Sequence, residues 1–171
     1  MTFAPPTRSE ALTPFHIGIV ATDLHAHMAE LTAVVGARWT SVRTRRAQIS
    51  MHGVDRTVAL QVAYTVDGPF RLEVIQSVPG TIWAARHTRL HHIGCWSDEL
   101  GDDRTRLMSL GLPAVAEAMD PDTGQRRWTY HRRPEGYLFE LVASSNKPRL
   151  EAWWAGGGEE PAPPAGQGGE A

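Results

Sequence analysis

Cysteine, lysine and long apolar runs are scarce or missing in this chain of 171 residues. Cys95 is the single cysteine, which excludes an internal disulfide, and it is most simply a small core residue. No apolar stretch approaches the roughly 18 residues of a transmembrane helix, and the first residues lack the apolar core of a signal peptide. A formal net charge of -2 does not favour nucleic acid or an anionic membrane as a partner. We therefore expect a soluble cytoplasmic protein.

The length suits one ordinary domain or two small modules that share a core. Beyond residue 155 the chain consists of Gly, Pro, Glu, Ala and Gln without a large apolar side chain. Such a segment cannot bury enough surface to offset its ordering entropy. The predicted segments are a flexible leader (1–11), a first module (12–78), a connector (79–88), a second module (89–146), a short C-terminal helix or turn (147–154) and a disordered tail (155–171).

A short motif occurs twice. The tetrapeptides Phe-His-Ile-Gly and His-His-Ile-Gly begin at residues 15 and 91, and each is followed later by a glutamate inside an apolar run. Two histidines and two glutamates at repeated positions predict one metal site built from two similar halves. The four candidate ligands are His16, Glu73, His92 and Glu140.

The hydrophobic pattern repeats with the motif and predicts the order β-α-β-β-β twice, in an α+β fold. Leu24, Met28, Leu31 and Val35 share one helical face, with Thr22 or Asp23 as the N-terminal cap and Gly36 as the C-terminal cap. The remaining expected elements are strands at 15–20, 38–42, 57–64, 70–76, 90–96, 114–118, 127–131 and 137–144, a polar hairpin or loop at 43–56, and a second helix at 99–110.

Alternate residues of a strand share a face. His16 and Gly18 therefore share one face, as do His92 and Gly94, so we expect each glycine to leave room for substrate over the metal. Phe15 and His91 are expected on the opposite faces. The other candidate substrate-binding residues are Trp96, Gln61 and Tyr130. Trp96 shares the His92 face of its strand. Gln61 and Tyr130 each face the site in one of the two possible orientations of their strands, and the sequence leaves that orientation open.

These features resemble the vicinal oxygen chelate superfamily, which includes glyoxalase, methylmalonyl-CoA epimerase, extradiol dioxygenases and antibiotic-resistance proteins. The resemblance covers roughly residues 14–145, and Leu-His-His-Ile at 90–93 and Phe-Glu-Leu at 139–141 are similar to the epimerase branch. It implies two tandem βαβββ modules whose mixed sheets curl into an open cup around one divalent metal ion: Zn, Ni, Co, Mn or Fe. It also implies that the four candidate ligands hold this ion, and that a homodimer is an expected assembly.

Such a site favours a metal-dependent lyase or isomerase that stabilises an enolate or enediolate of a carbonyl or acyl-thioester substrate. Glu140 and Glu73 are the candidate bases. One feature departs from the epimerases, which resemble one another in carrying a second catalytic glutamate on the third strand of the first module. Here that strand, 57–64, contains Gln61 and no acid, and an amide cannot accept a proton at neutral pH. Two-base epimerisation therefore lacks a base, and one-base chemistry remains.

Several alternatives stay open at this stage. The chain is alternatively a protein of the same fold that sequesters an aromatic or hydrophobic molecule, or an Fe(II) dioxygenase, against which the second carboxylate argues. The two glutamates could instead pair with Arg71 or Arg127. Residues 43–46 contain three arginines that form either a solvated face or a clamp for a substrate phosphate or carboxylate. Trp153 and Trp154 are expected to cover the surface of the domain. The remaining histidines are expected at the surface or rim: His25, His27, His52, His87 and His131.

Overall fold

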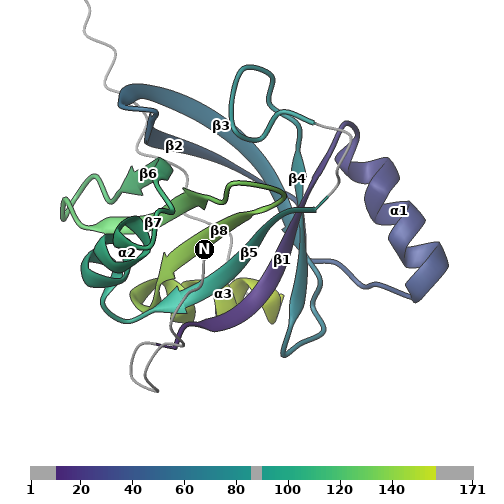
Figure 1. Cartoon of the computed structure of the whole chain (residues 1–171). Helices are drawn as coiled ribbons and strands as arrows, with labels where there is room; N and C mark the ends of the chain where they lie inside the picture. Colours follow the sequence, from purple (N-terminus) through teal and green to yellow (C-terminus); the bar gives the residue numbers. More distant parts are fainter. Residues whose placement is uncertain (1–10, 86–89, 157–171) are drawn as a thin grey trace, which may run out of the picture.

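In the residues that the computed structural model describes, 11–85 and 90–156, eight strands form one curled sheet that closes into a barrel with three α-helices against it (Figure 1). The strand order around the barrel is β1-β4-β3-β2-β6-β7-β8-β5. The predicted mixed α+β class is confirmed. The elements are β1 (Thr13–Ala21), α1 (Leu24–Val35), β2 (Arg43–Met51), β3 (Val54–Tyr64), β4 (Arg71–Gln76), β5 (Leu90–Ser97), α2 (Leu100–Ser109), β6 (Ala114–Met119), β7 (Arg126–Arg132), β8 (Leu138–Ala143), the 3₁₀-helix η1 (Ser144–Asn146) and α3 (Lys147–Trp154).

The strand predicted at 38–42 is wrong. Within that range Trp39 forms an isolated bridge with Thr65, and the strand proper, β2, begins at Arg43. β2 pairs with β3 as an antiparallel hairpin. Of the two structures expected for residues 43–56, a polar hairpin or a loop, the hairpin is the one observed. The turn consists of His52 and Gly53, with φ of 53° and 77°. Two successive positive φ angles suit the two-residue turns whose twist matches the flanking strands.

β2 also pairs with β6, and this pairing closes the barrel. Residues 49–51 of β2 lie opposite residues 116–118 of β6. The expected open cup is therefore corrected to a closed curled sheet. Closure satisfies the backbone groups of two strands that would otherwise be exposed edges. Ala116 and Ala118 are buried at this junction.

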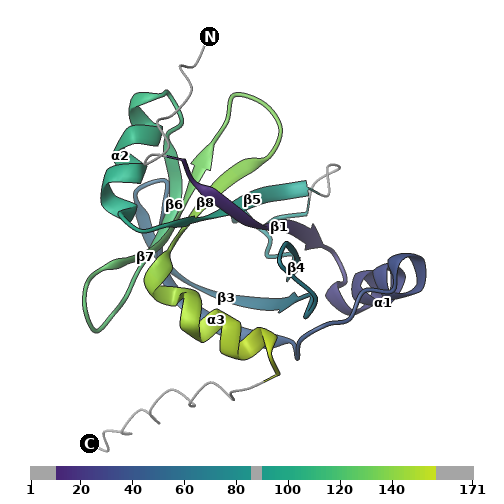
Figure 2. The ribbon, with the colours of Figure 1, turned by 90° about the horizontal axis from the view of Figure 1, so that it is seen from below.

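One large apolar cluster fills the barrel, and two segments outside the sheet contribute to it. Helix α3 lies against the barrel (Figure 2) and supplies Leu150, Trp153 and Trp154 to the cluster. The connector between β4 and β5 supplies Trp83, which is fully buried and makes edge contacts with Trp128 and Tyr130. The C-terminal helix and part of the connector are thus components of the core.

Helices α1 and α2 lie on opposite sides of the barrel (Figure 1) and pack on its outer face. Leu100 and Leu107 of α2 pack in a cluster with Cys95 of β5. α1 is capped by Asp23 and Gly36, as the sequence predicts. The sequence predicts that Val35, at the end of α1, belongs to the buried face, and this is wrong because Val35 is 63% exposed. The helix packs on the sheet through its first turns, and its last turn lies away from the sheet.

None of the helices in residues 11–85 and 90–156 has the length and apolarity needed to cross a membrane. The predicted leader up to residue 10, the predicted tail from residue 157 and His87 lie outside the described residues.

Candidate metal centre

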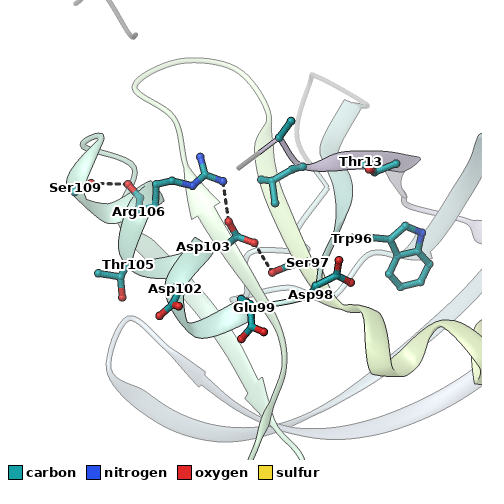
Figure 3. A pocket seen from close by; sticks show the side chains of 12 residues that line it. Thr13, Trp96, Ser97, Asp98, Glu99, Asp102, Asp103, Thr105, Arg106 and Ser109 are labelled. Atoms are coloured by element: carbon teal, nitrogen blue, oxygen red, sulfur yellow. Dashed lines mark hydrogen bonds and ion pairs between the residues drawn. The ribbon is translucent and has the colours of Figure 1, made fainter. Parts of the chain in front are cut away.

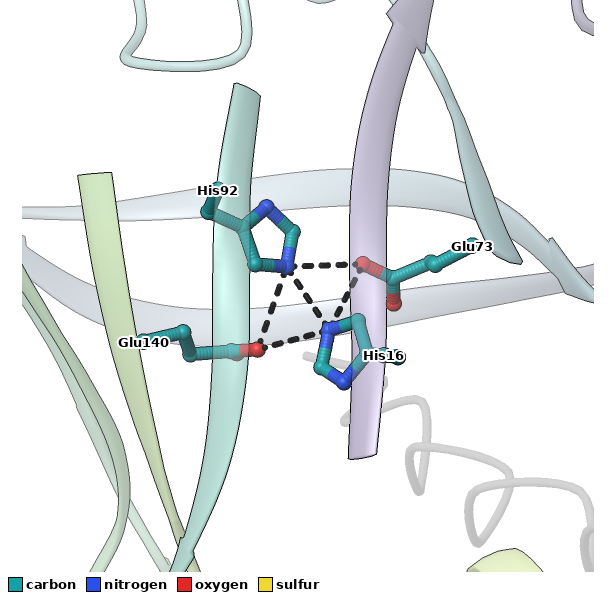
Figure 4. Close-up of side chains that lie close together, drawn as sticks. All are labelled: His16, Glu73, His92 and Glu140. Atoms are coloured by element: carbon teal, nitrogen blue, oxygen red, sulfur yellow. Dashed lines mark hydrogen bonds and ion pairs between the residues drawn. The ribbon is translucent and has the colours of Figure 1, made fainter. Parts of the chain in front are cut away.

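The four candidate ligands lie on four neighbouring strands. His16, Glu73, His92 and Glu140 are on β1, β4, β5 and β8, which are adjacent in the order β4-β1-β5-β8. Their side chains converge inside the barrel, where the strands bring together residues far apart in the sequence (Figure 4). These four residues are referred to below as the tetrad.

The histidine Nε2 atoms and one Oε2 atom of each glutamate face one another. The two Nε2 atoms are 2.8 Å apart. His16 Nε2 lies 3.5 Å from Glu73 Oε2 and 3.1 Å from Glu140 Oε2. The corresponding distances from His92 Nε2 are 3.1 Å and 3.3 Å. All four residues are buried, and each offers one atom to a group whose members lie within 4.8 Å of one another.

Two glycines allow this convergence. Gly18 is paired with both Glu73 and His92 on the strands that flank it, so it lies between them. A Cβ atom on Gly18 would lie 1.8 Å from Cε1 of the His92 ring. A contact that short is impossible, so the missing side chain is a condition for the observed ring position.

Gly94 has the same place in the other half. It is paired with His16 and Glu140, and a Cβ atom there would lie 1.8 Å from Cε1 of the His16 ring. The prediction that the glycines leave room for substrate therefore needs correction. Each glycine leaves room for the histidine of the opposite half of the chain.

Two β-bulges interrupt the pairing of β1 with β5. Phe15 is the extra residue in one bulge and His91 in the other. A bulge turns its extra residue away from strict alternation, and both side chains lie beside the tetrad instead of on the opposite face predicted from parity. The Phe15 ring contacts the His16 ring at 4.3 Å, and the His91 ring contacts the His92 ring at 5.1 Å.

His91 orients the His92 ring through a hydrogen-bond chain. His91 Nε2 lies 2.8 Å from the carbonyl oxygen of Ile82, so this nitrogen donates. Burial lowers the pKa of His91 to about 4, so the ring is neutral and its Nδ1 carries a lone pair. That Nδ1 lies 2.9 Å from Nδ1 of His92, which therefore donates. The Nε2 lone pair of His92 is left facing the tetrad.

Replacing His91 by phenylalanine is expected to weaken divalent-metal binding by about 10-fold, because a second-sphere partner that fixes a ligand's tautomer typically contributes at least that much. Metal titration by calorimetry measures the change. His131→Phe is the matched control, since His131 also makes two buried hydrogen bonds, to Leu112 and Thr129, away from the tetrad. Equal metal affinities in the two variants would contradict a positioning role for His91.

The tetrad is strongly coupled by charge. Burial by itself would lower the pKa of His16, but the carboxylates of Glu73 and Glu140 prevail and raise it to about 9. They also raise the pKa of His92 against the effect of burial. Burial would raise the pKa of each glutamate, and the histidines lower both instead. The buried cluster therefore favours positive charge at its centre.

A divalent ion fits this arrangement better than protons do. Two Nε2 atoms 2.8 Å apart cannot both carry a hydrogen, because the hydrogens would point at each other. Glu73 Oε2 is buried without a hydrogen-bond partner. Ligand atoms about 2.0–2.2 Å from one shared ion would lie roughly 3–3.5 Å apart, close to the distances in the tetrad. The donor set of imidazole nitrogens and carboxylate oxygens suits borderline divalent metals.

Tyr64 distinguishes the two carboxylates. Its hydroxyl donates a short hydrogen bond to Glu73 Oε1. Burial and the two neighbouring carboxylates raise the pKa of Tyr64 well above its ordinary value, so the hydroxyl keeps its proton. Glu73 is therefore held by Tyr64 as well as by the histidines, and Glu140 lacks this additional anchor from Tyr64.

A cavity of about 710 Å³ opens onto the tetrad. Glu73 and Glu140 are part of its lining, and Trp83, Trp128 and Tyr130 give it an aromatic wall. Arginines also line it: Arg45, Arg46, Arg127 and Arg149. The tetrad thus faces a space large enough for a small organic molecule.

The predicted substrate-binding residues are placed differently. Tyr130 lines this cavity, and its ring lies 5.1 Å from that of His92. Gln61 is exposed, because Leu60 and Val62 take the inward positions of β3. Trp96 stacks on Phe15, with ring centroids 3.8 Å apart, and lies outside the cavity lining.

Other sequence expectations near the site also change. His131, expected at the surface or rim, is fully buried on the α2 side. Arg71 lies 3.9 Å from the Trp154 ring and does not pair with Glu73. Trp83 and Tyr64 were not identified from the sequence as parts of the site. Tyr64 is the last residue of a predicted strand, two residues after the inward-facing Val62. Since alternate residues of a strand share a face, the sequence could have placed Tyr64 on the inward face as well.

A second hollow, of about 580 Å³, runs along α2 (Figure 3). Its polar side chains largely satisfy one another: Ser97 donates to Asp103 at 2.6 Å, and Arg106 contacts the same carboxylate at 2.8 Å. Nothing there resembles the converging donors of the tetrad, so the barrel cavity is the candidate site.

Comparisons with known proteins agree with this geometry. The profile of the glyoxalase/bleomycin resistance protein/dioxygenase superfamily matches residues 15–130. No curated protein matches the sequence. Among solved structures, methylmalonyl-CoA epimerase from Mycobacterium tuberculosis is 15% identical with a TM-score of 0.56, over 81% of this chain and 91% of that one. A variant of the Streptomyces coelicolor epimerase in complex with 2-nitronate-propionyl-CoA is 20% identical with a TM-score of 0.53, over 78% and 98%.

At these identities the structural likeness shows the fold alone, whereas the profile covers more than half of the chain. The doubled histidine motif had predicted the same superfamily. The chain belongs to the glyoxalase/bleomycin resistance protein/dioxygenase superfamily, that is, to the vicinal oxygen chelate proteins.

Proposed function

We propose that this chain is a metal-dependent lyase or isomerase that forms an enolate or enediolate from a small carbonyl or acyl-thioester substrate. The observation that carries the proposal is the tetrad itself, four buried donors converging beside a cavity of about 710 Å³. A divalent ion bound there would polarise the substrate carbonyl and offset the negative charge that develops when a neighbouring C–H bond loses its proton.

Glu140 is the residue that we assign as the base. Proton transfer requires a carboxylate that reaches the substrate, and Glu140 lines the cavity. Glu73 lines it too, but the hydrogen bond from Tyr64 holds Glu73 in place. In this assignment Glu73 remains a ligand and Glu140 accepts the proton.

The cavity supports one-base chemistry. Among the described residues that line it, Asp122 is the single acid besides the two tetrad glutamates, and it is exposed in the turn between β6 and β7. A base acting from the opposite face of the substrate is therefore not provided by the lining. A lyase, or an isomerase that returns the proton to the same face, needs only Glu140. The acyl-thioester class is supported by the propionyl-CoA analogue that is bound to the Streptomyces coelicolor relative.

Metal content tests the proposal directly. Purified protein is expected to contain about one equivalent of Zn, Ni, Co, Mn or Fe by mass spectrometry, since the tetrad offers donors for one ion. The His92→Ala variant is expected to lose that metal. His25→Ala, which changes an exposed histidine of α1, is the control and should keep it.

The reaction is then measured as exchange of substrate α-protons with D₂O, followed by NMR over a panel of oxoacids and acyl thioesters. Exchange that requires the metal supports the proposal. A metal-free protein whose cavity is filled by a co-purified metabolite would contradict it and favour sequestration, and Fe with oxygen consumption would favour a dioxygenase.

A further inference from the structure

Arg45 presents unused hydrogen-bond donors inside the barrel. It lies on β2, lines the same cavity as the tetrad, and its guanidinium is 4.7 Å from the Trp153 ring. Its Nε and Nη2 atoms are buried without a hydrogen-bond partner. By contrast, Arg104 and Arg126 both pair with Glu117 at 2.9–3.0 Å on the outside of the barrel.

Two buried donors of this guanidinium lack a hydrogen-bond partner and require an explanation. A guanidinium is a hydrogen-bond donor only. Leaving its buried N–H groups unsatisfied is unfavourable, and stacking on Trp153 compensates the charge but does not satisfy Nε–H and Nη2–H, which lie in the plane of the group. A planar anion such as a carboxylate, or a phosphate, accepts from both donors at once.

The position of Arg45 relates this donor pair to the tetrad. Arg45 is paired with Leu60 of β3, and Tyr64 of β3 is paired with Glu73 of β4. β3 alone therefore separates the strand of Arg45 from the strand of Glu73, about 10 Å across the sheet, and Leu60 and Tyr64 are roughly 13 Å apart along β3. The backbones of Arg45 and Glu73 are thus roughly 16 Å apart, and both side chains line one cavity. One small molecule can reach both groups. Arg46, Arg127 and Arg149 line the same cavity and add positive charge.

We propose that Arg45 binds an oxoanionic group of the substrate, a carboxylate or a phosphate, away from the carbonyl that reaches the tetrad. This inference rests on the proposed function and narrows its substrate class to anionic carbonyl compounds. It also favours one of the two interpretations of the arginines at 43–46, a clamp for a substrate anion instead of a solvated face. Arg45 is the clamp, and Arg46 is an exposed residue of the same cavity lining.

The test is anion binding to the metal-free protein, so that no anion is held by an ion at the tetrad. Inorganic phosphate and succinate are titrated separately at low ionic strength by calorimetry, with tryptophan fluorescence as a second readout. Arg45→Met is expected to weaken the binding of at least one of them by about 10- to 100-fold, the range of a charge-assisted hydrogen bond. The anion that shows this dependence identifies the group as a phosphate or a carboxylate.

Arg56→Met removes the same charge from an exposed residue of β3 outside the cavity lining and is expected to change affinity by less than about 3-fold, as for an exposed charge. Arg45→Lys keeps the charge over Trp153 but loses the fork of donors, and an intermediate loss is expected. If Arg45→Met lowers the thermal midpoint and leaves both affinities unchanged, or if the wild-type protein binds neither anion, Arg45 only holds α3 and the inference is wrong.

The two proposals fail independently. Arg45-dependent anion binding in a protein that never holds metal would overturn the enolate mechanism and leave the anion site standing. One equivalent of metal with metal-dependent proton exchange, and no effect of Arg45→Met on anion binding, would do the reverse.

Discussion

Glu140→Gln is expected to slow α-proton exchange by about 10²- to 10⁴-fold, the usual contribution of a positioned general base, while leaving about one equivalent of metal bound. Glutamine keeps a carbonyl oxygen at the position of the carboxylate, but an amide does not accept a proton at neutral pH. Because Glu140 is buried against both histidines, the isosteric side chain occupies the same space. NMR exchange rates and metal analysis on the same preparation provide the two measurements.

Glu73→Gln is the matched comparison, because Glu73 is the equivalent residue of the other half. We expect it to lower metal affinity and to disturb the hydrogen bond from Tyr64. Its exchange rate at saturating metal should fall less than that of Glu140→Gln. The opposite ranking, with near-normal exchange in Glu140→Gln, would assign the base to Glu73.

Gly94→Ala is expected to lower the free energy of unfolding by about 1–3 kcal/mol, as overpacking of a well-packed core does. We also expect metal affinity to fall by about 100-fold, the upper end of the range for disturbing the support of a ligand. One added methyl group would occupy the place of the His16 ring, which cannot move without leaving the tetrad. Denaturant unfolding with and without metal, together with metal titration, measures both effects.

Gly101→Ala provides the control, since a Cβ atom there meets nothing within 4 Å. Because Gly101 lies in α2, alanine should leave stability unchanged or raise it by up to about 1 kcal/mol. Normal metal affinity in Gly94→Ala would mean that the His16 ring has another position compatible with binding, and would contradict the close fit between the two halves.

The sequence predicts the convergence of the tetrad because the information is local and repeated. Each histidine begins a short apolar strand, and each glutamate interrupts another, so the duplicated order brings the four together. The neighbours of the histidines are a different matter. Strict alternation along a strand predicts that Phe15 and His91 lie on the face away from the tetrad. The two bulges that turn their side chains toward the tetrad depend on the pairing between β1 and β5.

The segments that the sequence predicts poorly depend on distant partners. β2 contains three arginines and few large apolar residues, and its inward face is covered by Trp153, which approaches Arg43 and Arg45 at 4.7 Å. Trp83 belongs to a stretch with turn-forming residues and packs against β7 of the second half. In both cases tertiary contacts, rather than local pattern, determine the conformation.

The reciprocal fit of glycine and histidine has an evolutionary consequence. Position 18 is complementary to position 92, and position 94 to position 16, so each half contains the recess for a ring that the other half encodes. Recombination that replaced one half of the gene with that of a relative would preserve the centre only if the incoming half retained its glycine. The two halves, although separate in sequence, therefore depend on each other for the convergence of the tetrad.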